Sequence, residues 1–185
     1  MIKSKQDLKE YIHADRSRYE LRKPMVLGWI LKDESYMVFR FLRILRKLEY
    51  YTNKNRSFWD SLYYIYYTLR HRWLEHSSRI RLRPNIADKG LYIPHCIGGV
   101  IINAKSVGQY CTINTGVIIG NKHQAENKPT IGDYVELTIG SKIIGRINIG
   151  DHVIVAPNSV VIKDVEAYSV VSGIPAVKIK SLRND

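Results

Sequence analysis

Cysteine, acidic residues and long apolar runs are all scarce in this sequence of 185 residues. Its two cysteines, Cys96 and Cys111, are spaced neither like a disulfide framework nor like a metal-ligand motif. No continuous apolar run reaches about 18 residues, so no transmembrane helix is predicted. The first seven residues lack the apolar core of a signal peptide. We therefore expect a reduced, cytoplasmic protein that holds no metal.

The shortage of acidic residues gives a net charge of +12, and most of the excess lies in the first part of the chain. Residues 1–83 carry 19 Lys and Arg against 9 Asp and Glu, whereas residues 84–185 carry 10 against 8. Nine of the thirteen tyrosines also lie in residues 1–83. Such a region could be a packing and oligomerisation surface, or it could contact an anionic membrane surface peripherally. Nucleic acid is not predicted, because no recognisable nucleic-acid module accompanies the basic residues.

Residues 1–83 are predicted to form three helices. Ser4 can cap a first helix that runs to about residue 19. Asp33 or Ser35 can open a second helix that runs to about residue 51. Ser57 opens the outline of a capping box, with Asp in place of the usual Glu, and a third helix follows to about residue 76.

The remainder of the chain repeats an aliphatic residue every six positions. This register comprises Val107, Ile113, Ile119, Ile131, Leu137, Ile143, Ile149, Val155 and Val161. A second register of mostly small or β-branched residues lies four positions later and comprises Cys111, Val117, Val135, Ser141, Ile147, Val153, Ser159 and Val165. Helices and alternating strands do not repeat every six residues, whereas a hexapeptide β-helix does. Both registers are therefore predicted to point inward, with successive coils about 4.8 Å apart.

The repeat, a loop that interrupts it after Ile119-Gly120, and the closing sequence Ser172-Gly173-Ile174-Pro175-Ala176 resemble the left-handed β-helix acyltransferases. Within them the nearest likeness is the serine-acetyltransferase-like branch, which includes sugar and capsule O-acetyltransferases. The resemblance implies a mainly β fold, a left-handed parallel β-helix with an amino-terminal α-helical cap. It also implies a homotrimer with active sites between subunits.

Three segments are predicted from the charge distribution and the repeat together. Residues 1–83 would form the helical, basic cap that packs and oligomerises. Residues 84–177 would form the β-helix acetyltransferase domain, and residues 178–185 a carboxyl-terminal tail.

An O-acetyltransferase needs a general base that removes the proton of a hydroxyl, and histidine is the usual choice. His95 occupies the place of the base in the resembling family, so the resemblance implies that it is catalytic. Cys96 is its neighbour, but adjacent residues on a strand face opposite sides, so no Cys–His pair is expected. Nearby backbone N–H groups would stabilise the oxyanion.

The resemblance implies acetyl-CoA as the donor, with its pantetheine arm along an edge of the β-helix. The expected contacts are Gly120, Gly140 and Ser141 along the arm, Gly173, Pro175 and Ala176 near the adenine, and Lys178 and Lys180 at the phosphates. Any of these glycines could instead be a corner residue of the fold.

The loop residues Asn121, Lys122 and His123 are predicted to bind the acceptor in a neighbouring subunit, although a polar loop can also be merely solvated. Serine acetyltransferases have an acidic residue just before the catalytic histidine, where this chain has Pro94. They have a second acid further upstream, where Arg81 and Arg83 stand, and a histidine before the loop proline, where Lys128 stands.

The missing acids favour a saccharide hydroxyl as the acceptor, in a capsule, lipopolysaccharide or other glycan precursor. Serine O-acetylation is the alternative, and a non-catalytic β-helix scaffold is a second alternative. Without an acidic neighbour, His95 would be oriented by another group, such as a backbone carbonyl.

Overall fold

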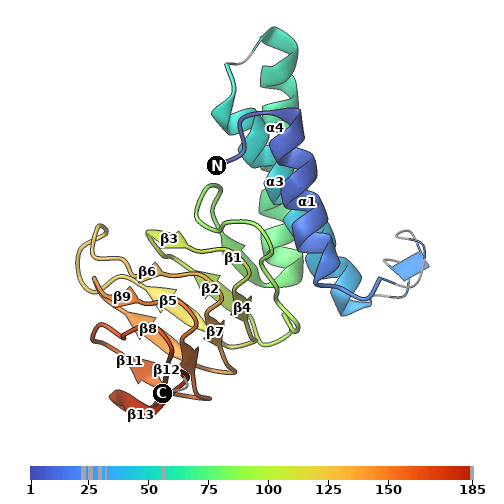
Figure 1. Cartoon of the computed structure of the whole chain (residues 1–185). Coiled ribbons are helices and arrows are strands. Elements are labelled where there is room, and N and C mark those ends of the chain that lie inside the picture. Colours follow the sequence, from blue (N-terminus) through green and yellow to red (C-terminus); the bar gives the residue numbers. More distant parts are fainter. Residues whose placement is uncertain (22–23, 25–26, 29–30, 32, 56, 184–185) are drawn as a thin grey trace.

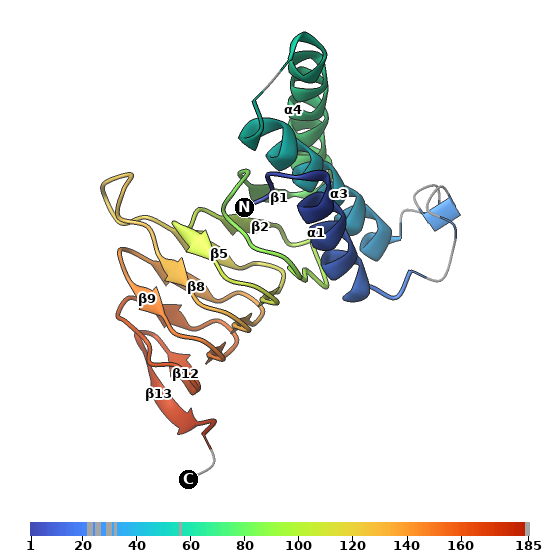
Figure 2. The same cartoon turned by 45° about the horizontal axis from the view of Figure 1, so that its top comes forward.

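The molecule consists of a prism of short strands with helices beyond one of its ends (Figure 1). This computed structural model describes residues 1–21, 24, 27–28, 31, 33–55 and 57–183. In both views the helices lie at the opposite end of the prism from the last strand (Figure 2). Within the described residues, no helix is long and apolar enough to span a membrane.

The structure describes three helices, α1 (Lys5–Ser17), α3 (Glu34–Asn53) and α4 (Phe58–Ser78). Ser4 caps α1 in a reciprocal capping box with Asp7, and Asp33 caps α3. Ser57 and Asp60 form the predicted capping box of α4. The three helices predicted from their caps are therefore confirmed, because each cap satisfies backbone N–H groups that a helix leaves unpaired.

The strands are short, and most of them contain two or three residues. They are β1 (Ile80–Leu82), β2 (Val100–Ile102), β3 (Ser106–Val107), β4 (Thr112–Ile113), β5 (Ile118–Gly120), β6 (Thr130–Ile131), β7 (Glu136–Leu137), β8 (Lys142–Ile144), β9 (Asn148–Ile149), β10 (Ile154–Val155), β11 (Val160–Val161), β12 (Ser169–Gly173) and β13 (Ala176–Ser181).

Three sheets form the faces of the prism. The first face contains β1-β2-β5-β8-β11, the second β3-β6-β9, and the third β4-β7-β10-β12 with β13 at its edge. All pairs are parallel except β12 with β13. The chain visits the faces in the order first, second, third, and each coil therefore turns three corners.

The six-residue register forms columns of buried side chains inside the prism. On the first face Leu82, Ile102, Ile119, Ile143 and Val161 are paired one above the other, and none is more than 2% exposed. The register predicted to point inward is thus confirmed. Parallel stacking explains the repeat, since an apolar residue in each coil covers the residue of the coil before it.

The β-region extends beyond the predicted boundaries at both ends. β1 pairs with β2 and so belongs to the prism, although it precedes residue 84. Isolated bridges at Ala87 and Tyr92 complete the first coil. At the other end β13 enters the predicted tail over 178–185.

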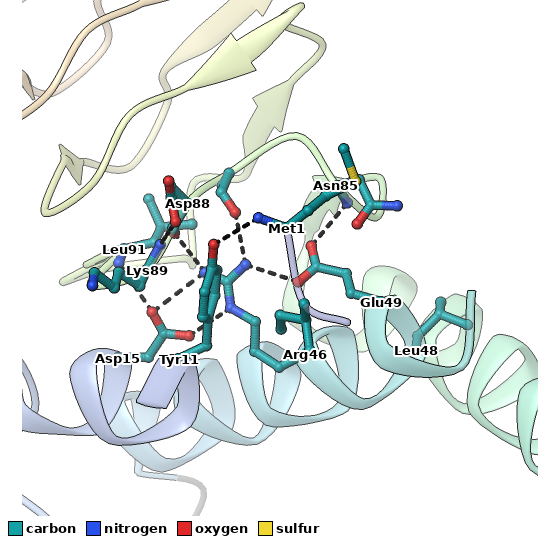
Figure 3. A network of polar contacts seen from close by, with 12 residues as sticks. Met1, Tyr11, Asp15, Arg46, Leu48, Glu49, Asn85, Asp88, Lys89 and Leu91 are labelled. Carbon is teal, nitrogen blue, oxygen red and sulfur yellow. Dashed lines mark hydrogen bonds and ion pairs between the residues drawn. The ribbon is translucent and has the colours of Figure 1, made fainter. Parts of the chain in front are cut away.

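A buried ion network joins the helices to this first coil (Figure 3). Arg46 of α3 donates from Nε to Asp15 of α1 at 2.8 Å and from Nη1 to Glu49 at 3.0 Å. Its guanidinium also donates to the carbonyl oxygens of Ala87 and Asp88, both at 2.7 Å. Burial lowers the pKa of Arg46, but the charges of Glu49 and Asp15 outweigh burial and raise it above its ordinary value.

The two carboxylates also accept hydrogen bonds from the coil itself. Asp15 accepts from the N–H groups of Gly90 and Leu91, at 2.8 and 3.1 Å, and Glu49 accepts from the N–H of Asn85 at 2.8 Å. The network therefore fixes α1 and α3 against the first coil.

Candidate active site

His95 lies in the first coil, at the corner where the chain passes from the third face to the first. Tyr92 before it bridges to the third face, and β2 after it belongs to the first. The His95 side chain is 64% exposed, and its Nδ1 lies 3.1 Å from Oε2 of Glu34. Glu34 is the first residue of α3, so the start of this helix meets the corner of the prism.

Glu34 binds the backbone of the same corner. Its Oε1 accepts hydrogen bonds from the N–H groups of Cys96 and Ile97. Burial raises the pKa of Glu34, but the hydrogen bonds from Cys96, His95 and Ile97 outweigh burial, and the pKa lies below its ordinary value. Glu34 is therefore ionised at neutral pH.

The ionised carboxylate determines which nitrogen of His95 carries the proton. A carboxylate can only accept, so Nδ1 of His95 is the donor and Nε2 keeps its lone pair. The ring is held at one nitrogen by Glu34 and can accept a proton at the other. The expectation that a backbone carbonyl orients His95 is wrong, because a carboxylate 61 positions earlier does so.

Cys96 is unsuited to nucleophilic attack. Its side chain is buried, and burial together with the charge of Glu34 raises the pKa of the thiol to about 12. The expectation that Cys96 and His95 form no catalytic pair agrees with this environment.

Below His95 the same corner is built from stacked backbone. The N–H of Gly116 donates to the carbonyl of Gly99 at 2.7 Å, and the N–H of Gly140 donates to the carbonyl of Thr115 at 3.0 Å. Gly140 has a φ of +70°, and a Cβ there would lie 2.2 Å from Oδ1 of Asn158. The positive φ therefore favours glycine at position 140 as a corner residue of the fold.

Several of the predicted donor contacts lie along this edge of the prism. Gly140 lies two coils beyond that of His95, and Gly173 lies two coils further and donates from its N–H to Oγ of Ser159 at 3.1 Å. Four coil spacings separate His95 from Gly173, or about 19 Å. Pro175 and Ala176 follow Gly173 at the same end.

Two other predicted donor contacts do not share this exposed edge. Ser141 is fully buried, and its hydroxyl has no hydrogen-bond partner in the described part of the chain. The prediction that Ser141 contacts the donor is therefore wrong for its side chain, which points into the core. Gly120 ends β5 and lies at the corner between the first and second faces. A Cβ at Gly120 would meet only Cδ1 of Ile144, at 3.7 Å, so the fold does not require this glycine.

The two predicted phosphate-binding lysines lie on β13 and are exposed. Lys178 pairs with Glu166, with Nζ to Oε2 at 3.0 Å, while Lys180 is opposite Val170 of β12. Both cations are accessible at the end of the edge that contains Gly173.

The interrupting loop projects from a different corner, between β5 and β6 (Figure 2). Asn121 accepts from Nδ2 of Asn103 at 3.0 Å and donates to the carbonyl of Gln124 at 3.1 Å. Lys122 and His123 are exposed. Within one chain the structure therefore does not bring these three predicted acceptor-binding residues to His95.

No protein-family model matches the sequence. Curated relatives do match about half of it. A serine acetyltransferase of Synechococcus elongatus is 36% identical over 111 residues, which cover 56% of this chain and 46% of the relative. A serine acetyltransferase of Staphylococcus aureus is 39% identical over 94 residues, which cover 50% of this chain and 44% of the relative. This chain thus spans less than half the length of these relatives.

Solved structures resemble the chain over nearly its whole length. The Neisseria gonorrhoeae serine acetyltransferase superimposes with a TM-score of 0.70 at 21% identity, covering 97% of this chain and 67% of that one. The soybean serine acetyltransferase apoenzyme superimposes with a TM-score of 0.73 at 24% identity, covering 94% of this chain and 69% of that one. A serine acetyltransferase in complex with CoA superimposes with a TM-score of 0.64 at 20% identity, covering 95% of this chain and 71% of that one. The fold is a left-handed parallel β-helix with amino-terminal helices. That prediction is confirmed.

The same comparisons overturn the predicted saccharide acceptor, because these relatives are named serine acetyltransferases. The prediction rested on the lack of acidic residues beside His95 in the sequence. The structure supplies the carboxylate of Glu34 from another element. The absence of a nearby acid in the sequence was therefore no argument against serine.

Proposed function

We propose that this chain transfers an acetyl group from acetyl-CoA to the hydroxyl oxygen of L-serine. The observation that carries the proposal is the pair of His95 and Glu34 at an exposed corner. It is supported by the likeness of about half of the chain to serine acetyltransferases, whose name gives both the acceptor and the transferred group.

The proposed chemistry is one direct transfer. Nε2 of His95 takes the proton of the serine hydroxyl while that oxygen forms a bond to the acetyl carbonyl carbon. Glu34 keeps the ring oriented through Nδ1 and stabilises the positive charge that the imidazole acquires. The carbon–sulfur bond then breaks, and His95 returns the proton to the departing thiolate, which leaves as free CoA.

The donor would lie along the corner below His95, towards Gly173 and Lys178. The corner runs along the prism for about 19 Å, which suits an extended ligand such as the pantetheine arm. Lys178 and Lys180 would meet the phosphates with their charges.

We propose a homotrimer with its sites between subunits. Support comes from the separation of His95 and the loop over 121–129, which lie at different corners of the prism. A loop from a neighbouring copy could close a site that the chain's own loop does not reach. Residues 1–83 would assist this assembly as its cap. A cytoplasmic location is also proposed, and both cysteines are free thiols.

The test is acetyl-CoA consumption, followed by thiol release, with L-serine as acceptor and with D-serine and L-threonine for comparison. We expect turnover with L-serine, reduced on the order of 10²–10⁴-fold by His95→Ala in a folded protein. His13→Ala, which replaces an exposed histidine of α1, is the matched control and should keep full activity. Full activity in folded His95→Ala would overturn the assignment. Absence of both turnover and acetyl-CoA binding by calorimetry would favour a non-catalytic scaffold.

A further inference from the structure

The outer face of α4 is covered by large apolar side chains. We call this set the α4 stripe, and it comprises Phe58, Trp59, Leu62, Ile65, Tyr66, Leu69 and Trp73. Their exposed fractions range from 46% for Leu62 to 73% for Phe58. A contiguous apolar surface of this kind is uncommon on a soluble protein and marks a surface that meets another apolar one.

The stripe is separate from the face of α4 that holds the fold together. Its members recur every three or four residues, so they share one side of the helix over a length of about 22 Å. The opposite side packs on α3, where Leu74 and His71 are buried and Tyr67 stacks on Tyr51 with ring centroids 5.5 Å apart. The stripe is therefore free to serve a partner without unpacking α4.

Positive charge borders the stripe. Arg70 and Arg72 lie on α4 itself, and the guanidinium of Arg70 lies 5.6 Å from the ring of Trp73. On the neighbouring α3, Lys47 lies 5.4 Å from the ring of Tyr67, on the opposite side of α4 from the stripe. Arg43, further along α3, is exposed.

Arg40 of α3 lies close enough to Arg70 and Arg43 for their charges to repel its own. Burial lowers the pKa of Arg40, and the charges of Arg70 and Arg43 lower it further. A surface that gathers like charges around an apolar centre is matched by an apolar phase with negative charge at its boundary.

The two acidic residues of α4 do not offset this charge at the stripe. Asp60 is bound to Lys54 at 2.9 Å and to the cap residue Ser57. Glu75 accepts from the backbone N–H of Leu82 at 3.2 Å. Both are partly buried, away from the exposed face.

From this arrangement we propose that α4 lies flat on the surface of an anionic lipid bilayer, with its stripe among the acyl chains and its arginines at the headgroups. Tryptophan and tyrosine favour the boundary between lipid and water, and basic residues favour anionic headgroups. A second copy of the chain fits less well, because pairing two stripes would bring the bordering arginines of both copies together.

The proposal does not depend on the acetyl transfer, since neither His95 nor Glu34 belongs to the stripe. The experiment uses the full chain and sucrose-loaded vesicles, made of phosphatidylcholine alone or of phosphatidylcholine and phosphatidylglycerol in a three-to-one ratio. Sedimentation measures the bound fraction, and tryptophan emission reports on the three tryptophans of the chain, of which Trp59 and Trp73 belong to the stripe. We expect binding to the anionic vesicles only, with emission shifted to shorter wavelength, and weaker binding as salt rises.

The double variant Leu62→Glu with Leu69→Glu should lower the affinity for anionic vesicles on the order of tenfold or more, because it places two negative charges among the acyl chains. Lys9→Glu, at an exposed position of α1, lowers the net charge by two, as the double variant does. It serves as the matched control, and we expect at most a small loss of vesicle affinity. Arg43→Gln should weaken binding about fivefold, because one basic residue near the surface is lost.

Equal sedimentation with both kinds of vesicle, or unchanged binding by the double variant, would overturn the proposal. Light scattering of the protein without lipid tests the competing occupant, a second copy of the chain. Assembly that grows with protein concentration and disappears in the double variant, with no vesicle binding, would assign the stripe to a second copy. If the double variant fails to fold by circular dichroism, Arg43→Gln and the salt dependence still decide.

Discussion

The β-helix and its junction with the amino-terminal helices bury different kinds of side chain. Inside the β-helix the stacked columns are apolar, and the buried polar side chains there are serines. Where the helices meet the first coil, the centre is Arg46 with Asp15 and Glu49, all at most 2% exposed. Among the described residues, these are the buried charged side chains.

The difference shows what each kind of contact can specify. An apolar column holds any coil against any similar coil, because burial is not directional. An ion network holds only when the charges meet at the right distances, so it fixes one placement of α1 and α3 on the first coil. Glu34 reaches His95 from that same α3, so the position of the helix matters for the site.

The largest effect on stability is expected from Arg46→Met. This change leaves Asp15 and Glu49 buried without their cation, and we expect the free energy of unfolding to fall by about 3–5 kcal/mol. Urea denaturation followed by circular dichroism measures it. Arg43→Met, on the exposed side of the same helix, should change stability by less than about 0.5 kcal/mol. Equal losses in the two variants would contradict a special role for the network.

A somewhat smaller loss is expected within the β-helix. Leu137 is fully buried between Ile113 and Val155 in a column of the third face. Leu137→Ala should lower the free energy of unfolding by about 3 kcal/mol through lost burial and the remaining cavity. Ile139→Ala, at a 52% exposed corner residue, is the control and should have little effect. If both variants lose the same amount, the columns do not hold the coils as described.

The site lies where the two regions meet, and Glu34→Gln tests their coupling. The amide can still accept the backbone hydrogen bonds of Cys96 and Ile97, but it carries no charge to stabilise the protonated ring. We expect kcat to fall about tenfold and the apparent pKa of the pH–rate profile to fall, since a nearby negative charge is removed. Glu10→Gln, which alters a surface pair with Lys89, is the control. A lower rate with an unmoved profile would make Glu34 purely structural.

The smallest effect is a pH dependence of stability from the same carboxyl. The pKa of Glu34 in the folded protein lies below its ordinary value of 4.5. Its contribution is therefore complete above pH 4.5 and is lost as the pH falls through the lower, folded value. The difference in unfolding free energy between the unaltered protein and Glu34→Gln should thus be present at pH 7 and shrink in acid. A difference that grew in acid would contradict this sign.

Much of the fold was predictable because its signals are local. Inward positions recur every six residues, and helix caps such as Ser4 and Ser57 lie within one turn of the helix they begin. His95 was predicted from a resemblance, since it occupies the place of the base in the resembling family. The burial of Ser141 was also available in the sequence, since it belongs to the second inward register together with Val135 and Ile147.

Glu34 could not be found in this way. It contacts His95 only because α3 packs its first turn on a corner of the prism, and no spacing in the sequence records that contact. The same limit explains why the predicted β-region begins at residue 84, after the strand β1 that belongs to it. Residues 80–82 form only one short strand. Their partner β2 is adjacent in the sheet but follows in the sequence only after a whole coil.

The interrupting loop leaves β5 and returns to β6 at a single corner, outside all three sheets. Ile119 pairs with Ile143 as directly as Ile143 pairs with Val161, although the first interval contains six more residues. Residues could therefore be gained or lost in this loop without shifting a single strand pair. In the proposed trimer, such changes would alter what the protein recognises while the scaffold stays constant.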